Sequence, residues 1–370
     1  MTNLTTTPQG KVRVVWIDYA KFIGIILVIC AHQTKNLGWF DFISAFGIPL
    51  FFFLSGFLFS FKKYDNYQSF LKARVKQLVI PYFLMNFIAY IPWLFFFRHL
   101  NEFFYSTSHF YKSFAGIFYG NGFDDWLMQC IPSWFIICLF TLENIYFLLF
   151  RNLKGTYKYL ALASFFLICW LDGKYDPVRW PWGFNVALVG IIFYGAANLF
   201  KENVKQLVAL STPILALISA STLPIVLFVA SRNHADMNLN LYNNYPLFFL
   251  GGFAGIIFIL TLSRLLDRLV GHVKLYEYIA QNTMFIMAFH LMVMSLVNLF
   301  IMSVFNLSAK DITDSPYLSA TVITATVLIL LPLIHLCNQH FPILLGKPQK
   351  AAQNQRSGVR AMGHRKVETA

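Results

Sequence analysis

The sequence predicts an all-α membrane protein, a bundle of about ten transmembrane helices with both termini in the cytoplasm. Hydrophobic residues make up 58% of the chain and charged residues only 12%, whereas soluble domains carry about 25% charged residues. The mean hydropathy is +0.59. Long apolar runs recur at the spacing that a hydrocarbon core of about 30 Å requires of successive helices.

The apolar runs define the expected helices in chain order. They cover residues 14–33, 41–61, 77–97, 131–150, 157–172, 183–200, 207–230, 245–262, 279–303 and 316–337. The first run is too long for a signal peptide and lacks a small-residue cleavage site, so we expect it to stay as a helix. Residues 1–340 are expected to form one polytopic domain, and residues 341–370 a basic, disordered cytoplasmic tail.

Lysines and arginines are unevenly shared between the two sets of alternate connections. Most of the 29 lie before the first helix, in one set of connections and in the tail. The other set holds Lys35, Arg98, Lys112, Lys174, Arg179, Arg232 and Lys310. The positive-inside rule therefore places both termini in the cytoplasm. Topology and anionic membrane lipids explain the net charge of +13, so we expect no nucleic-acid partner.

The first expected helix carries three ionisable residues, Asp18, Lys21 and His32. At about 100° per residue, Lys21 and His32 project within roughly 20° of each other, about 16 Å apart along the axis. Asp18 precedes Lys21 by three residues and can pair with it. Charged groups in a membrane helix favour a functional site that faces the protein interior. The simpler alternative is that Lys21 snorkels to the inner headgroups and His32 is hydrated at the outer interface.

The second helix and the segment after it carry motifs with two interpretations each. Pro49 predicts a bend, and Ser55 with Gly56 forms a small patch that lets another helix approach closely. Packing alone would explain that patch. Lys72, Arg74 and Lys76 follow in a basic segment that leads to Pro81-Tyr82. Their charges suit either a phosphate-bearing cytosolic ligand or lipid headgroups.

The expected outer connections, residues 98–130, 172–183 and 231–244, mix aromatic residues with Asp, Asn and Arg. Such side chains can stack on sugar rings and bond their hydroxyl groups, or they can form an interfacial aromatic belt. Further along, Trp134 opens the fourth helix, and Asn282 and His290 share the ninth. A lone histidine in an apolar helix is more often a satisfied structural residue than a catalytic one.

Several kinds of site have no support in the sequence. The five cysteines are scattered, lie mostly in apolar runs and form no CxxC pair, so we expect buried thiols and no metal site. The chain contains no phosphate-binding GxxxxGKS, no HExxH and no GxSxG motif.

The motifs together resemble the acyltransferase-3 family of integral membrane acyltransferases, in particular its polysaccharide O-acetyltransferase branch, over roughly residues 12–338. The matching stretches are Trp16–Asp18 with Lys21 and His32, Ile48–Gly56, Lys72–Tyr82, Ser133–Phe135, and Asn282–Thr283 with His290. Two departures stand out. Many members of that branch carry a histidine at the position of Gly47, and an arginine pair where this chain has Lys72 and Lys76.

The resemblance implies transfer of an acyl group, with acetyl expected, from cytosolic acyl-coenzyme A to a hydroxyl of an extracytoplasmic carbohydrate, a surface glycan or its precursor. Arg74, Lys72 and Lys76 would hold the phosphates of acetyl-CoA, with Lys21 deeper and oriented by Asp18. His32 would act as general base or as transient acyl carrier, since a histidine with an ordinary pKa near 6.5 suits proton transfer.

Supporting roles would fall to Ser55, Trp134, Asn282 and His290. The expected location is the plasma (cytoplasmic or inner) membrane, in multi-pass form. A transporter or flippase for a glycan or a lipid-linked sugar would use the same polar groups as a permeation path and is the main alternative. An assembly or structural component of the membrane is a third.

Overall fold

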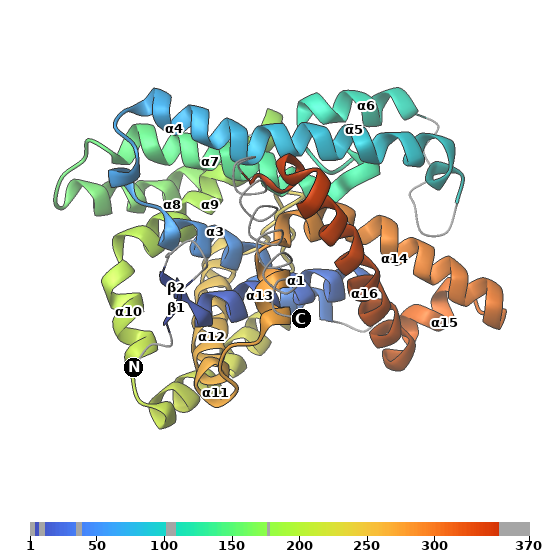
Figure 1. Ribbon diagram of the computed structural model, residues 1–370. Coiled ribbons are helices and arrows are strands. Elements are labelled where there is room, and N and C mark those ends of the chain that lie inside the picture. The colour runs from blue at the N-terminus through green and yellow to red at the C-terminus, as the bar shows by residue number, and fades with distance from the viewer. Residues whose placement is uncertain (1–3, 7–11, 35–38, 101–108, 176–177, 348–370) are drawn as a thin grey trace, which may run out of the picture.

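A computed structural model describes residues 4–6, 12–34, 39–100, 109–175 and 178–347, which form a bundle of helices (Figure 1). In chain order the helices are α1 (Val15–Gln33), α2 (Trp39–Ser44), α3 (Gly47–Leu58), α4 (Tyr67–Arg74), α5 (Ile80–Phe95), α6 (Phe110–Tyr119), α7 (Trp134–Phe150), α8 (Tyr157–Tyr175), α9 (Phe184–Leu199), α10 (Lys201–Ala209), α11 (Thr212–Ala230), α12 (Tyr245–Leu269), α13 (Lys274–Ala280), α14 (Thr283–Phe305), α15 (Ala309–Asp314) and α16 (Pro316–His340). Before α1, β1 (Leu4–Thr6) pairs antiparallel with β2 (Val12–Val14).

Within the described ranges, nine helical segments are long and apolar enough to cross a membrane. They are Val15–Gln33, Trp39–Leu58, Tyr67–Phe95, Met128–Phe150, Pro181–Leu199, Thr212–Ala230, Tyr245–Leu269, Thr283–Phe305 and Pro316–His340. These match nine of the expected helices, and the predicted all-α membrane bundle is confirmed. The remaining expected helix, 157–172, corresponds to α8, which packs along α9.

The second membrane segment is broken, but not where the sequence suggested. The turn at Ala45 and Phe46 separates α2 from α3, whereas Pro49 lies in the first turn of α3. A proline there loses no intrahelical hydrogen bond, because the first amide groups of a helix have no intrahelical acceptor. The bend expected from Pro49 therefore lies three to four residues earlier in the chain.

The basic segment that follows is already helical. Asn66 and Ser69 form a capping box that starts α4, and the chain continues through the π-helix η3 (Val75–Val79) into α5 without leaving helical geometry. Pro81 is accommodated in the first turn of α5. The basic residues are thus fixed on a rigid helix, and π-helical turns of this kind are frequent at functional sites.

The small patch of Ser55 and Gly56 on α3 allows another helix to pack closely against it. A Cβ at Gly56 would overlap the backbone carbonyl of Tyr194 on α9. The amide of Asn198, on the same helix, donates to the carbonyls of Gly56 and Phe59 at 3.0 and 3.1 Å. The prediction that another helix approaches Gly56 closely is confirmed.

The expected outer connections pack against one another. Arg179 donates to the Asn238 carbonyl at 2.8 Å and stacks over Phe123 at 4.7 Å, and Asn121 donates to the Trp180 carbonyl at 3.0 Å. Burial lowers the pKa of Arg179. Part of the polar and aromatic content of these connections therefore serves to hold one connection to another and to shape the wall of a cavity.

Candidate active site

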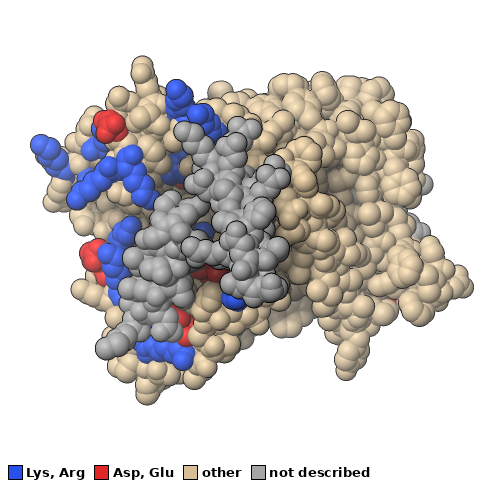
Figure 2. All heavy atoms as spheres, viewed as in Figure 1, with Lys and Arg blue, Asp and Glu red and all other residues tan. Residues whose placement is uncertain are grey.

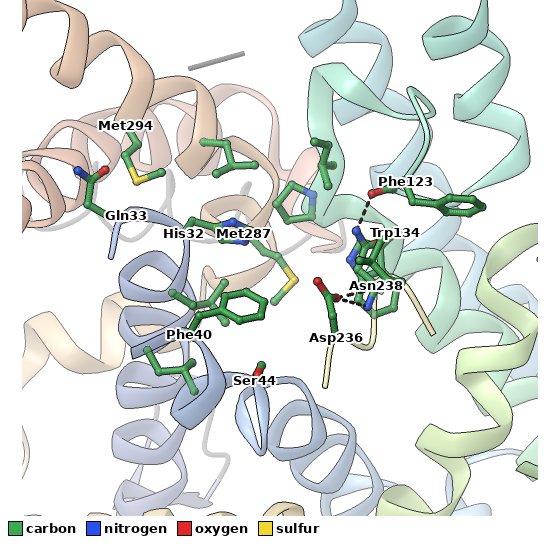
Figure 3. A pocket seen from close by; sticks show the side chains of 18 of the residues that line it. His32, Gln33, Phe40, Ser44, Phe123, Trp134, Asp236, Asn238, Met287 and Met294 are labelled. Carbon is green, nitrogen blue, oxygen red and sulfur yellow. Dashed lines mark hydrogen bonds between the residues drawn. The ribbon is translucent and has the colours of Figure 1, made fainter. Parts of the chain in front are cut away.

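A cavity of about 770 Å³ opens between the end of α1, the α2–α3 turn, α14, α15 and two of the outer connections (Figure 3). Its volume suits a drug-sized organic ligand or a sugar. Polar lining residues come from each of these elements, namely His32, Gln33, Ser44, Asp124, Asp125, Asp236, Asn238, Ser295, Asn298, Lys310 and Thr313. In Figure 3, His32 lies on one side of this space, and Asp236, Asn238 and Trp134 lie on the other.

His32 reaches the cavity because α1 is one continuous helix that ends at Gln33. The side chain is partly buried and lies in the last turn, where Thr34 closes the helix by donating to the Cys30 carbonyl at 2.7 Å. The negative end of a helix dipole stabilises a positively charged imidazolium. His32 is therefore placed to accept a proton from a group in the cavity.

His290 lies directly behind His32. The two imidazole rings have their centroids 5.2 Å apart, tilted by 48°. His290 is completely buried, and its Nδ1 lies 2.9 Å from the carbonyl oxygen of Ile286 and 3.0 Å from that of Met287. Its Nε2 is buried without a hydrogen-bond partner among the described groups. The sequence led us to expect a satisfied structural histidine, and only one of its two nitrogens is satisfied.

A reciprocal pair of amides flanks His32. Gln33 donates to the Oδ1 atom of Asn298 at 3.3 Å, and Asn298 donates to the Oε1 atom of Gln33 at 3.0 Å. Both side chains are buried and both line the cavity. This pair was not expected from the sequence. The sequence does contain a signal for it, because Gln33 directly follows His32 and Asn298 interrupts the apolar run of α14.

The opposite wall is set by a tight turn. The carboxylate of Asp236 accepts from the backbone amides of Asn238 and Leu239 at 2.9 and 3.3 Å. The side-chain amide of Asn238 donates to the Gly122 carbonyl at 2.5 Å, while its Oδ1 atom is buried without a partner among the described groups. The carboxylate of Asp236 gives this wall an acceptor for hydroxyl groups.

Asp18 and Lys21 lie nearer the start of α1, away from this cavity. Asp18 is buried and Lys21 is partly buried, and neither is among the residues that line the cavity. The shared helix keeps the expected axial separation of about 16 Å between Lys21 and His32. The pairing of Asp18 with Lys21 stays a prediction.

Arg74 points inward, towards α7. Its Nε lies 2.9 Å from the Oε2 atom of Glu143, and its Nη1 donates to Gln77 at 2.8 Å. The guanidinium also lies within 6.0 Å of the ring centroids of Phe59, Tyr64 and Phe70. Only 3% of the Glu143 side chain is exposed, against 17% for Arg74, so the ion pair is shielded from solvent on the acidic side.

Glu143 is a further residue that was not expected from the sequence. It is the single acidic residue of the fourth expected helix, residues 131–150. An ionisable residue inside a membrane helix is costly, so it is usually paired or functional. That rule, applied to Glu143 alone, would have predicted a basic partner.

Lys72 and Lys76, in contrast, are exposed. Figure 2 shows Lys and Arg side chains gathered at the left-hand end of the molecule, around α4 and α10, which we call the basic end. There, burial and then the neighbouring ammonium groups of Lys205 and Lys63 lower the pKa of Lys201. The carboxylate of Glu202, 2.6 Å from the Lys205 ammonium, offsets part of this positive charge.

The supporting residues expected from the sequence fall in different places. Trp134 lines the cavity. Ser55 is partly buried on α3, next to the close contact at Gly56. Asn282 lies at the start of α14 and accepts hydrogen bonds from Asn338 at 3.3 Å and Lys347 at 3.0 Å. That cluster ties residues 341–347 to the bundle, while residues 348–370 of the expected tail lie outside the described residues.

A family model described as an acyltransferase domain matches residues 14–337. No curated protein and no solved structure matched the chain. Because the family match covers most of the sequence, the chain belongs to the acyltransferase-3 family.

Proposed function

We propose that this membrane acyltransferase moves an acyl group, acetyl as expected, from acyl-coenzyme A at the basic end to a hydroxyl of a carbohydrate bound in the cavity. The observation that carries the proposal is the position of His32, at the far end of α1 and inside a cavity lined by hydrogen-bonding groups. The basic end would face the cytoplasm and the cavity the opposite side, as the positive-inside rule predicts.

At the basic end, the coenzyme phosphates would meet Lys72 and Lys76, which are exposed on one rigid helix. Arg74 is engaged by Glu143 and Gln77, so its main task would be to fix that helix against α7. Lys21, partly buried along α1, would add positive charge deeper along the path of the coenzyme.

In the cavity, His32 would remove the proton from the acceptor hydroxyl as the hydroxyl oxygen attacks the thioester carbonyl. A positioned general base contributes roughly 10²- to 10⁴-fold to a rate. The Gln33–Asn298 pair and the Asp236 turn would bind the other hydroxyl groups of the sugar. The cavity volume of about 770 Å³ leaves room for a sugar and for the acyl end of the donor.

The test is mass spectrometry of surface glycans from cells of the source organism that carry the wild-type gene, no gene, or the His32→Ala variant. We expect acetyl-sized mass losses in the last two, with the variant protein still present in the plasma membrane. Retained acetylation with His32→Ala would exclude the role of the histidine. Glycans that vanish from the surface, rather than lose acetyl groups, would support a transporter instead.

A further inference from the structure

His290 presents a buried hydrogen-bond acceptor at a defined place. Its Nδ1 faces two carbonyl oxygens, of Ile286 and Met287, and carbonyl oxygens only accept hydrogen bonds. The proton of the neutral ring is therefore on Nδ1, and Nε2 carries a lone pair. That Nε2 is buried and without a donor among the described groups, which is an unfavourable state for a polar atom.

His32 can supply a donor for this atom. His32 lies with its ring centroid 5.2 Å from that of His290. Two imidazoles joined edge to edge by a hydrogen bond of ordinary length have centroids about 5 Å apart. The separation therefore already allows such a bond once the rings turn so that Nε2 of His290 and a ring nitrogen of His32 face each other.

We infer that His290 is the positioning residue of His32. Its Nε2 accepts a hydrogen bond from one ring N–H of His32 and so holds the other His32 nitrogen unprotonated towards the cavity. This inference rests on the proposed function and adds to it the group that fixes the tautomer of the base. A carbonyl-anchored imidazole takes here the place that a carboxylate takes in many other histidine-dependent enzymes.

In the transfer step, each bond that forms is matched by one that breaks. The cavity-facing nitrogen of His32 takes the hydroxyl proton, the hydroxyl oxygen forms a bond to the acyl carbon, and the carbon–sulfur bond of the thioester breaks. The imidazolium returns its proton to the departing thiolate, which leaves as the free thiol of coenzyme A. His290 keeps its own proton throughout, and its Nε2 stabilises the positive charge on His32 while that charge exists.

The experiment compares three α14 variants of the full-length protein in detergent micelles or proteoliposomes. His290→Phe keeps a flat ring but removes the acceptor, and His290→Gln keeps an acceptor oxygen. Met292→Leu, at another buried position of α14, is the packing control. For His290→Phe we expect kcat to fall roughly 10- to 100-fold, the range for a hydrogen bond to a charged group, with KM for acyl-CoA unchanged.

His290→Gln should recover most of the lost kcat, and the control should match the wild type. His290→Phe in the His32→Ala background should cause no further loss, because the two residues act as one unit. Wild-type kcat in His290→Phe, or equal losses in the Phe and Gln variants together with a lower melting temperature, would overturn the inference. His32→Ala assayed alongside separates the two claims, since activity near the wild-type level in that variant would refute the role of His32 as the base, whatever the result for His290.

Discussion

Removing Arg74 should strand a carboxylate in the interior of the protein, and the structure predicts how costly that is. Glu143 has only 3% of its side chain exposed, whereas Arg74 has 17% exposed. The two single substitutions should therefore differ. Arg74→Leu should cost about 3–5 kcal/mol, the range for an uncompensated buried charge. Glu143→Leu should cost about 1–2 kcal/mol, because Arg74 can still reach Gln77 and solvent.

The variant that replaces both residues tests whether the loss of stability comes from the unpaired charge. Replacing both partners of a buried ion pair by apolar residues is often neutral. Arg74→Leu with Glu143→Leu should thus regain nearly all the lost stability, which makes the coupling between the two sites about 4–7 kcal/mol, the sum of the two single costs. Unfolding by SDS in mixed micelles measures these differences. Arg151 is the matched control, because it stacks on Phe147 at 5.0 Å and donates to the Asp65 carbonyl but is a more peripheral anchor.

The same variants separate two roles of Arg74. If Arg74 mainly fixes the basic helix, the double variant should also regain a KM for acyl-CoA within about threefold of the wild type, because a surface charge interaction is worth under about 1 kcal/mol. A stable double variant whose KM stays tenfold or more above the wild type would show that Arg74 binds the phosphates directly. Equal stability losses in the two single variants would refute the reasoning from burial.

Three further outcomes are expected. Lys72→Ala and Lys76→Ala should each raise KM for acyl-CoA several-fold without changing the melting temperature, and the effect should fade at high salt because exposed charges are screened; unchanged KM values in low salt would contradict their role. Gly56→Ala should destabilise the protein by about 1–3 kcal/mol, the cost of overpacking, and a melting temperature equal to that of the wild type would contradict the close helix contact. Asn298→Leu should raise KM for the acceptor and lower stability by about 1–3 kcal/mol, because it leaves the amide of Gln33 unpaired. Combining it with Gln33→Leu should restore stability but not the KM for the acceptor. Recovery of both stability and KM would show that the two amides have only a structural role.

Much of the fold could be predicted because a bilayer permits few solutions. A membrane helix must be about 20 residues long and apolar, so nearly every expected span has a counterpart in the structure. Details that depend on local geometry were less accessible. Pro49 suggested a bend, yet the chain turns at Ala45 and Phe46, because a proline in a first helical turn disrupts nothing.

The site could be predicted in part. His32 could be singled out because an ionisable group in an apolar run is conspicuous, and its helix carries it to the cavity wall, which Lys21 does not line. The Gln33–Asn298 pair and the contact of His290 with His32 were not accessible. Both join α1 to α14 across more than 250 positions of sequence, and helix periodicity constrains neighbours within one helix only.

The charge pattern did not predict where each basic side chain points. The basic segment and the family resemblance assign the coenzyme phosphates to Arg74 together with Lys72 and Lys76, and that role stays a prediction. In the structure the lysines face solvent while Arg74 turns to Glu143. The direction of each side chain depends on its position around the helix and on the acidic partner in α7. Composition alone predicts neither of these.

The most direct measurement of the central claim uses sealed proteoliposomes of known orientation. Labelled acetyl-CoA is supplied only on the side of the basic end, and a sugar acceptor only on the side of the cavity. We predict label on the acceptor within the opposite compartment for the wild type, and none for His32→Ala. Labelled acceptor only when the sugar and the acetyl-CoA share one side would contradict transfer across the membrane.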